Sequence, residues 1–545
     1  MIWLLGIPGF LLIVGGCAVV HGERDSDRLA GVRFERIQAA KSVTELDQWL
    51  AANQSLAQRL ARSSGAFSGY GCISLNASNN KPEGESELES DSDPDADAIE
   101  LEEDVDLDCV VVTGSRIMPE DIITNVQTSG IDEGGLLKRR GDHLLVLRGD
   151  EIFRIRIDSR DGPTLELEQS VSLTESAKGQ EVWYDELLVF EQGAAVLSFD
   201  FGRSVTGLQL YRMGSGGNLT AAAHIEIQSE DYYSGSNYGL RLIGDRALFQ
   251  VSVGLSPGAS WEWPLWRSLD IRSEELTPDE WQPLIDVGDV LLPLVPISDP
   301  VIHATLLCEV EAMLAGSLDC AATGLIAEYW SELYVSRTAA YVAMDTWKDE
   351  AYLVEGASPW SWRARTDPKL QGMSETLIYR LPLDDSESVG AVFISGERGN
   401  QFSFREIGDG LVTVTELLPD PDARLLGVHQ IPLDQFSGEA SEARNPRIQT
   451  ATLDVSHNHR TIRVADHHVL IGEHSLMVND PTVPMEQTEF VVLSLLESVP
   501  ERVILDQSVD RIEVLDGQIF VSGRGVAGKW SMSVLDPRSP DRVST

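Results

Sequence analysis

The chain has 545 residues, a length that allows about three domains or one large repeat architecture. Apolar residues make up 42% of it, which is enough for a sizeable core. Asp and Glu number 87 against 42 Lys and Arg, so the formal net charge is −45. Binding of nucleic acid requires clustered Lys and Arg side chains, and a surface this acidic would repel it. We therefore expect no nucleic-acid partner.

Residues 1–17 are typical of an export signal. The first twenty residues carry no charged side chain, and the small residues Gly15 and Gly16 precede Cys17. This stretch resembles a bacterial lipobox, in which Cys17 would be lipidated, although no Lys or Arg precedes the apolar run. The alternative is an uncleaved anchor, because about 20 apolar residues can span a bilayer. Both interpretations predict an N-terminal membrane tether and a location in the periplasm or at the cell surface.

The remaining cysteines indicate disulfides in an oxidising compartment. If Cys17 is lipidated, four cysteines remain: Cys72, Cys109, Cys308 and Cys320. Cys308 and Cys320 flank a short polar loop and are the favoured pair, while Cys72 and Cys109 would pair across an acidic segment. No cysteines form a CxxC pattern, which argues against metal clusters and thioredoxin-like chemistry.

Residues 18–76 are predicted to form an N-terminal segment with a helix over 33–62. Ser42 and Glu45 fit a capping box, and leucines recur after it at helical spacing. Residues 77–108 hold fourteen acidic side chains and one Lys. A segment that charged cannot form a core, so we expect a disordered linker.

From residue 109 to 545 the pattern changes to short apolar or alternating runs separated by tight turns. Examples are 143–157, 186–201, 332–344, 390–404 and 518–535. Hairpins recurring over this length, without long amphipathic helices, predict an all-β protein and favour a β-propeller of about seven or eight blades. A row of β-sandwich domains is the alternative, but it would require linkers after residue 110 that the sequence lacks.

Several segments of this region resemble one known family. They include Thr124–Gln127, Gly130–Gly135, Lys138, Gly141–Leu147, Trp183–Val189, Asp231–Ser234, Asn237–Tyr238, Arg241–Arg246, the Cys308–Cys320 loop, Ser336–Val342 and Asn400–Phe404. In this order they resemble secreted bacterial proteins whose β-propeller domain is distantly similar to WD40 repeats. The resemblance covers about residues 30–60 and 110–540. It implies the fold and export, and it implies no activity and no cofactor.

The chain departs from that family at its C-terminus, where family members add strands that complete the ring. Here the sequence ends soon after the hairpin at 518–535, as a C-terminally truncated member would. We therefore expect an incompletely closed ring with exposed strands, which invite pairing with other polypeptides.

Histidines at the C-terminal end supply a candidate metal site. His457 and His459 would share one face of a strand, since side chains alternate along it. His467, His468 and His474 follow, and with them the pair could hold zinc or copper. The spacing fixes no carboxylate or Cys ligand, so surface histidines are the favoured interpretation and no metal is predicted.

Paired carboxylates raise the alternative of a hydrolase. Asp132 and Glu133, and Asp185 and Glu186, are adjacent, so each pair points to opposite faces of a strand. Carboxylates from different blades could still meet in a central channel, as glycosidases require. The G-x-S-x-G match at 254–258 fails on mechanism, because Pro257 lacks the amide hydrogen of an oxyanion hole.

No motif in the chain supplies a reaction centre, so we predict a non-enzymatic protein without cofactor. The expected function is a monomeric, membrane-tethered binding or scaffold module of the bacterial envelope. Its partner would be an envelope protein, a peptide or a glycan. The alternatives are an envelope hydrolase that uses channel carboxylates and a metal-binding protein that uses the histidine cluster.

Overall fold

A computed structural model describes most of the chain after residue 34. The described residues are 35–63, 122–123, 127–128, 130–158, 164–173, 182–230, 239–255, 263–270, 277–278, 280–297, 299–347, 374–384, 387–417, 425–454, 460–473, 487–496, 500–515, 517–525, 529–537 and 539–544. Cys17, Cys72, Cys109 and the acidic stretch 77–108 lie outside them.

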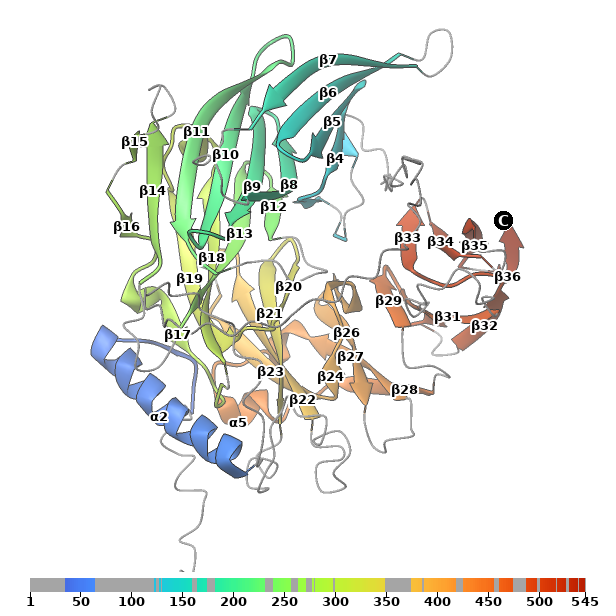
Figure 1. Cartoon of the computed structure of the whole chain (residues 1–545). Helices are drawn as coiled ribbons and strands as arrows, with labels where there is room; N and C mark the ends of the chain where they lie inside the picture. Colours follow the sequence, from blue (N-terminus) through green and yellow to red (C-terminus); the bar gives the residue numbers. More distant parts are fainter. Residues whose placement is uncertain are drawn as a thin grey trace, which may run out of the picture.

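The described residues form seven β-sheets arranged around a common axis as the blades of a propeller (Figure 1). The first blade contains β2 (Ile122–Ile123), β4 (Leu137–Arg140), β5 (His143–Arg148), β6 (Glu151–Asp158) and β7 (Thr164–Ser172). The second contains β8 (Val182–Phe190), β9 (Gly193–Asp200), β10 (Val205–Met213), β11 (Leu219–Gln228), β14 (Leu265–Asp270), β15 (Thr277–Pro278) and β16 (Gln282–Pro283).

The third blade is the most elaborate, because it takes in strands from the N-terminal part of the chain. Its order is β3 (Asp132–Glu133), β12 (Leu240–Ile243), β13 (Arg246–Gly254), β18 (Pro300–Glu309), β19 (Cys320–Glu328), β17 (Val290–Leu292) and β1 (Gln38–Ala39). The β17–β19 pair is parallel, and the other pairs of this blade are antiparallel. The helices α3 (Val310–Leu314) and η1 (Val287–Asp289) lie in its loops.

The remaining four blades are regular antiparallel sheets. The fourth contains β20 (Glu332–Val335), β21 (Ala339–Trp347), β22 (Ser374–Pro382) and β23 (Gly390–Ser395). The fifth contains β24 (Glu397–Arg398), η3 (Gln401–Ser403), β25 (Phe404–Ile407), β26 (Gly410–Leu417), β27 (Leu425–Pro432), η4 (Leu433–Gln435), α5 (Ala440–Ala443) and β28 (Gln449–Asp454). The sixth contains β29 (Arg460–Ala465), β30 (His468–Glu473), β31 (Thr488–Ser494) and β32 (Pro500–Leu505). The seventh contains β33 (Arg511–Leu515), β34 (Gln518–Arg524), β35 (Trp530–Asp536) and β36 (Ser539–Ser544).

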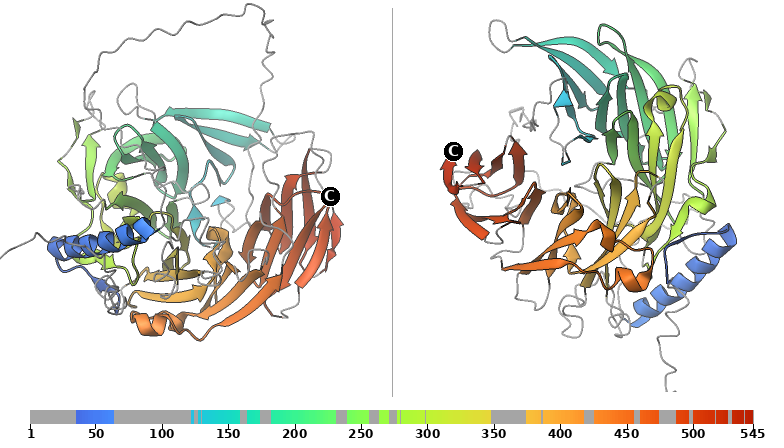
Figure 2. Two further views of the ribbon diagram at one scale, coloured as in Figure 1. Left: turned by 60° about the horizontal axis from the view of Figure 1, so that its bottom comes forward. Right: turned by 180° about the vertical axis from the view of Figure 1, so that it is seen from behind.

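The ring of blades is open between the first and the seventh. Figure 2 shows the C-terminal blade, in red, separated from the cyan first blade in both views. Within the ring, neighbouring blades are joined by apolar clusters, as where Leu145 of β5 packs with Val196 of β9 and where Val464 of β29 packs with Val414 of β26. The all-β fold and the incomplete closure were both predicted from the sequence.

Tight turns produce the hairpins that the sequence predicted. The turn between β5 and β6 consists of Gly149 and Asp150, and Gly149 has φ +59°, a left-handed conformation that suits glycine. A closer approach occurs at Gly193, where an added Cβ would lie 1.8 Å from the Tyr211 carbonyl oxygen. A side chain at that position would separate β9 from β10.

The N-terminal helix α2 (Val43–Ser63) docks on the third blade. The Glu45 amide donates to the Ser42 hydroxyl, as the predicted capping box requires. The Glu45 carboxylate accepts from the Lys41 amide, one residue before the Ser42 amide that the motif would use. Trp49 and Leu46 are buried, and the Asn53 side chain bonds the backbone of Ile297. The prediction of helix from residue 33 was wrong for residues 35–42, since Gln38–Ala39 pair with β17 and the helix begins at Val43. Residues 33 and 34 lie outside the described part of the chain. No helix in the described part of the chain is long and apolar enough to cross a membrane.

Candidate functional site

Residues 127–128 and 130–138, which follow β2 and lead into β4, bring the chain to the inner edges of several blades. The strand β3 pairs with β12 at the edge of the third blade, so that Glu133 lies opposite Arg241. The Gln127 side chain donates to the carbonyl oxygens of Gln401 and Phe404 in the fifth blade. Thr128 shares a 3.2 Å hydrogen bond with the Tyr334 hydroxyl of the fourth. This segment therefore contacts the third, fourth and fifth blades on the side that faces the axis of the ring.

A buried cluster of charges surrounds this segment, and we call it the axial cluster. It consists of Gln127, Asp132, Glu133, Lys138, Arg241 and Gln401. The Lys138 Nζ lies 3.0 Å from the Asp132 Oδ1 and also donates to the Glu133 carbonyl oxygen. Burial lowers the pKa of Lys138, while the adjacent carboxylates oppose that shift.

Arg241 completes the axial cluster from the third blade. Its Nε lies 3.8 Å from the Glu133 Oε1, and its Nη2 donates to the Gln401 Oε1 at 3.1 Å. The same Glu133 oxygen accepts the Gln127 backbone amide at 3.1 Å. Each axial carboxylate thus faces at least one buried cation, which compensates part of the cost of removing it from water.

Further arginines continue this polar zone toward the end of the ring. Arg405 donates to the Gln127 carbonyl oxygen at 2.5 Å and pairs with Asp466 at 2.9 Å. Arg463 lies 3.1 Å from Glu513 and donates to the Ile512 carbonyl oxygen of the seventh blade. Burial lowers the pKa of Arg463, and the charge of Glu513 opposes it. These contacts connect successive blades near their inner edges.

The hydrolase alternative needed two carboxylates that could share acid and base roles. Asp132 and Glu133 do lie near the axis, but Lys138 and Arg241 face them. Glu186 is buried and accepts the backbone amides of Gly239 and Leu240 at 2.8 and 2.9 Å. It therefore joins the second blade to the third. The Asp185 side chain, and Ser256 and Gly258 of the G-x-S-x-G match, lie outside the described residues.

Gly134 is required by the position of Glu186. A Cβ added at residue 134 would lie 2.2 Å from the Glu186 Oε2, so any larger residue would displace the carboxylate. The sequence resemblance included Gly134, and it also included Gln127, Lys138, Arg241 and Gln401 without indicating that they meet. No local pattern could have revealed this cluster, because its members are separated by up to 274 residues.

The candidate metal ligands are only partly within the described residues. His467 follows the end of β29 and is exposed, and His468 begins β30. Burial lowers the pKa of His468, and the neighbouring His467 acts in the same direction. His457, His459 and His474 lie outside the described residues. Among the residues that are described, no three His, Cys, Asp or Glu side chains are grouped so as to hold a metal ion.

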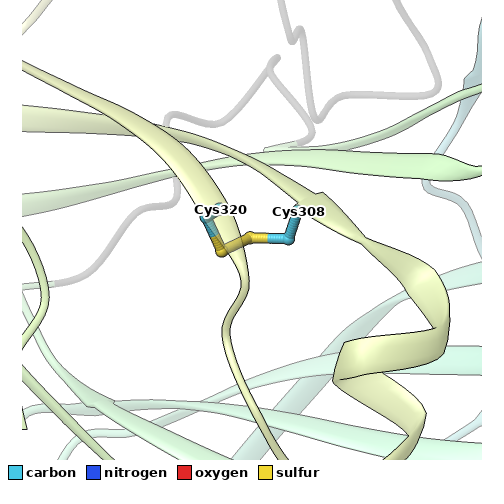
Figure 3. The surroundings of a disulfide bond; sticks show 2 residues. All are labelled: Cys308 and Cys320. Carbon is cyan, nitrogen blue, oxygen red and sulfur yellow. A yellow bond between two sulfur atoms is a disulfide. The ribbon is translucent and has the colours of Figure 1, made fainter.

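Cys308 and Cys320 form a disulfide in the structure (Figure 3). They lie opposite each other at the ends of β18 and β19, with α3 in the loop between them. The structure therefore contains the pairing that the sequence favoured, and the pairing of Cys72 with Cys109 lies outside the described residues.

The open ends of the ring present two apolar faces. The first-blade face consists of Leu144, Val146, Phe153, Ile155, Ile157, Leu165 and Leu167, which lie on the side of the sheet turned away from the second blade. Leu165 is 65% exposed and Leu167 58%. The last-blade face consists of Phe520, Trp530, Met532 and Val534, on the side of the sheet turned away from the sixth blade. Trp530 is 64% exposed and Met532 57%.

The geometry of seven radially arranged sheets agrees with a comparison against protein families. The family model described as "Beta propeller domain" matches residues 123–461, more than half of the chain. This protein belongs to the β-propeller domain family. The match begins at β2 and ends at the start of the sixth blade, and it confirms the family that the sequence segments indicated.

Several solved structures are similar to parts of this β-propeller protein at low sequence identity and low TM-score. The tricorn protease covers 74% of this chain at 10% identity and a TM-score of 0.29, and this chain spans only 38% of it. AztD from Citrobacter koseri covers 71% at 11% identity and a TM-score of 0.28, with 87% of its own length matched. The Synechocystis apocarotenoid oxygenase covers 72% at 10% identity and a TM-score of 0.29, with 83% of its length matched. No curated protein sequence matches the chain.

Proposed function

We propose that this β-propeller protein is an exported, membrane-tethered binding module of the bacterial envelope, monomeric by itself and without a reaction of its own. The observation that carries the proposal is the pair of apolar faces at the ends of the ring, which include side chains that are exposed in the described part of the chain, such as Leu167 and Trp530. Soluble proteins rarely leave contiguous apolar surface exposed unless it binds something. The favoured partner is a protein, ahead of a peptide or a glycan.

Two features support the other parts of the proposal. The axial carboxylates are paired with Lys138 and Arg241, as expected of groups that hold blades together. The Cys308–Cys320 disulfide suits an oxidising compartment, and so does the apolar leader before Cys17.

Capture from the native envelope tests the proposal. The mature protein, tethered at Cys17, would be cross-linked in intact cells and purified beside a control lipoprotein of similar size. We expect at least one envelope polypeptide to be enriched with the propeller. If nothing is enriched over the control, the binding role is contradicted.

A further inference from the structure

The outermost strand of each blade carries a row of backbone amide and carbonyl groups that its own sheet does not pair. In three blades an extended segment from elsewhere in the chain covers this row. β1 pairs with β17 of the third blade, and β15 and β16 pair with β14 of the second. Ser437 exchanges two hydrogen bonds, of 2.9 and 3.0 Å, with Ala391 of β23 in the fourth. Addition of a short strand is therefore how this molecule covers an outer edge.

Four outermost strands have no such added segment among the described residues: β7, β28, β32 and β36. Three of them carry charged residues or prolines, which commonly keep a strand edge from pairing. These are Glu166 and Glu168 in β7, Pro500, Glu501 and Arg502 in β32, and Pro540, Asp541 and Arg542 in β36. β28 differs, because Gln449–Leu453 contains neither kind of residue before Asp454 ends the strand.

The side chains of β28 lie on two sides of its sheet. Ala451 and Leu453 lie on the side of the sixth blade, where Leu453 packs in the apolar cluster between the two blades. Thr450 and Thr452 lie on the opposite side, since side chains alternate along a strand. Residues 449–452 are exposed. A strand paired with this edge would therefore contact small, uncharged side chains on both sides.

One positive charge lies just before this edge. Arg447 is exposed and has no carboxylate partner among the described residues. In antiparallel pairing, the C-terminal end of an added strand lies beside Arg447, so an acidic residue at that end would be complementary. Symmetric pairing of two β28 strands places odd-numbered residues opposite odd-numbered ones. Arg447 would then face Gln449, Ala451 or Leu453, so a second copy of this edge supplies no acidic residue.

We propose that the outer edge of β28 binds an extended segment of a different polypeptide, which adds an antiparallel strand to the fifth blade. The segment has apolar residues beside Ala451 and Leu453, and Thr or Ser beside Thr450 and Thr452. An acidic residue at its C-terminal end lies beside Arg447. Main-chain hydrogen bonds supply the affinity, and the alternating side chains supply the specificity. This edge is separate from the faces at the ends of the ring, so the inference goes beyond the proposed function and is tested independently of it.

A peptide of sequence VTVTVTD tests the edge. In antiparallel register its Val residues lie opposite Leu453, Ala451 and Gln449, and its Asp lies opposite Arg447. The control peptide VTPPVTD has two adjacent prolines, one of which lacks an amide that the pairing requires. Fluorescence anisotropy of the labelled peptides with the purified protein should show that VTVTVTD binds at least about tenfold more tightly. Its binding should also slow hydrogen exchange at alternate residues of β28, whose amides point away from β27.

Variants of the protein locate the binding. Ala451→Lys/Thr452→Lys places charges on the edge and should weaken the binding of VTVTVTD at least about tenfold. Ile504→Lys, on the outermost strand of the sixth blade, should leave binding unchanged, and Ile504 is 58% exposed. The substituted side chains are exposed, so all of these variants should keep the thermal midpoint of the parent. Arg447→Glu should weaken the binding of VTVTVTD and strengthen that of VTVTVTK.

Several results would overturn the inference while leaving the proposed function intact. They are no binding of VTVTVTD, equal binding of VTPPVTD, and undiminished binding to the Ala451→Lys/Thr452→Lys variant. A dimer of the parent protein that this variant converts to a monomer in analytical ultracentrifugation would also overturn it, because the edge would then pair with a second copy of the chain.

Discussion

Two strands of similar length, β18 and β7, differ in what covers them. In β18 the nine residues Pro300–Cys308 are all buried, because sheets pack on both faces of the third blade. In β7 most residues are exposed, although Leu165, Leu167 and Val171 alternate with polar residues as in a half-buried strand. Part of the difference follows from position, because β18 lies in the interior of its sheet and β7 is the outermost strand of the first blade. The outermost strand of the fifth blade, β28, is also mostly exposed, although that blade packs on the fourth and the sixth. Burial of a strand in this fold therefore depends on its place within the blade as well as on the neighbouring blades.

The largest difference in the free energy of unfolding is expected between a variant that loses a buried charge and one that loses an exposed charge. Arg241→Met removes a buried partner of Glu133 and Gln401 and should lower the free energy of unfolding by about 3–5 kcal/mol. Arg156→Met removes a solvent-accessible cation of the first blade, whose ion pairs are screened by water, and should lower the free energy of unfolding far less. Urea denaturation of both variants measures this. Equal losses would mean that the axial cluster adds no more than a surface ion pair.

The next largest difference in stability is expected between truncating a buried apolar side chain and truncating an exposed one. Leu208 is fully buried between the second and third blades, so Leu208→Ala should cost about 2–5 kcal/mol. Leu167→Ala on the first-blade face should change the stability of the isolated protein by less than about 0.5 kcal/mol. Denaturant midpoints of the two variants measure these changes. A large loss of stability from Leu167→Ala would show that the first-blade face is already covered in the isolated protein.

The disulfide should stabilise the third blade without affecting the ends. Replacing both Cys308 and Cys320 by Ala opens a loop with a sequence separation of 12 and should cost about 3 kcal/mol. Calorimetry of the oxidised parent and the double variant measures the difference. Binding at the first-blade face should survive the change, and its loss would tie the disulfide to the open end.

Stability should also depend on pH through interior histidines. Burial lowers the pKa of His303 to about 4, and an unfolded histidine titrates near 6.5. Between these values the unfolded chain binds a proton that the folded chain does not, so this stabilising contribution is complete above about pH 6.5 and decreases as the pH falls toward 4.

The His303→Gln variant isolates that contribution. Glutamine can still donate to the Glu328 carbonyl oxygen, which accepts from the His303 Nε2 at 2.8 Å, and it does not titrate in this range. The parent should lose up to about 1.4 kcal/mol more than the variant for each pH unit within the window. If the curves of unfolding free energy against pH run parallel for the parent and the variant, the assignment of this pH dependence to His303 is contradicted.

The fold could be predicted because its signals are local. Tight turns such as Gly149-Asp150, alternating runs and the Ser42–Glu45 capping box each depend on a few consecutive residues. The Cys308–Cys320 pairing is likewise local, since it closes one hairpin. These features indicated hairpins in series, from which a propeller follows.

The sites could not be predicted, because they depend on contacts across the ring. Gln127 bonds residues 274 and 277 positions later, and Glu186 bonds amides 53 and 54 positions later. The uncovered faces carry the same alternation as covered ones, so only the arrangement of blades distinguishes Leu167 from Leu208. The lipidation of Cys17 and the histidine cluster remain predictions.

The central claim is that the end faces are uncovered in the isolated protein and covered by a partner in the envelope. Hydroxyl-radical footprinting compares two methionines directly: Met532 of the last-blade face and Met344, which is buried in the fourth blade. The account predicts rapid oxidation of Met532 and slow oxidation of Met344 in the isolated protein, with Met532 protected in the complex captured from the envelope. Equal protection of the two in the isolated protein, or unchanged oxidation of Met532 in the complex, would contradict it.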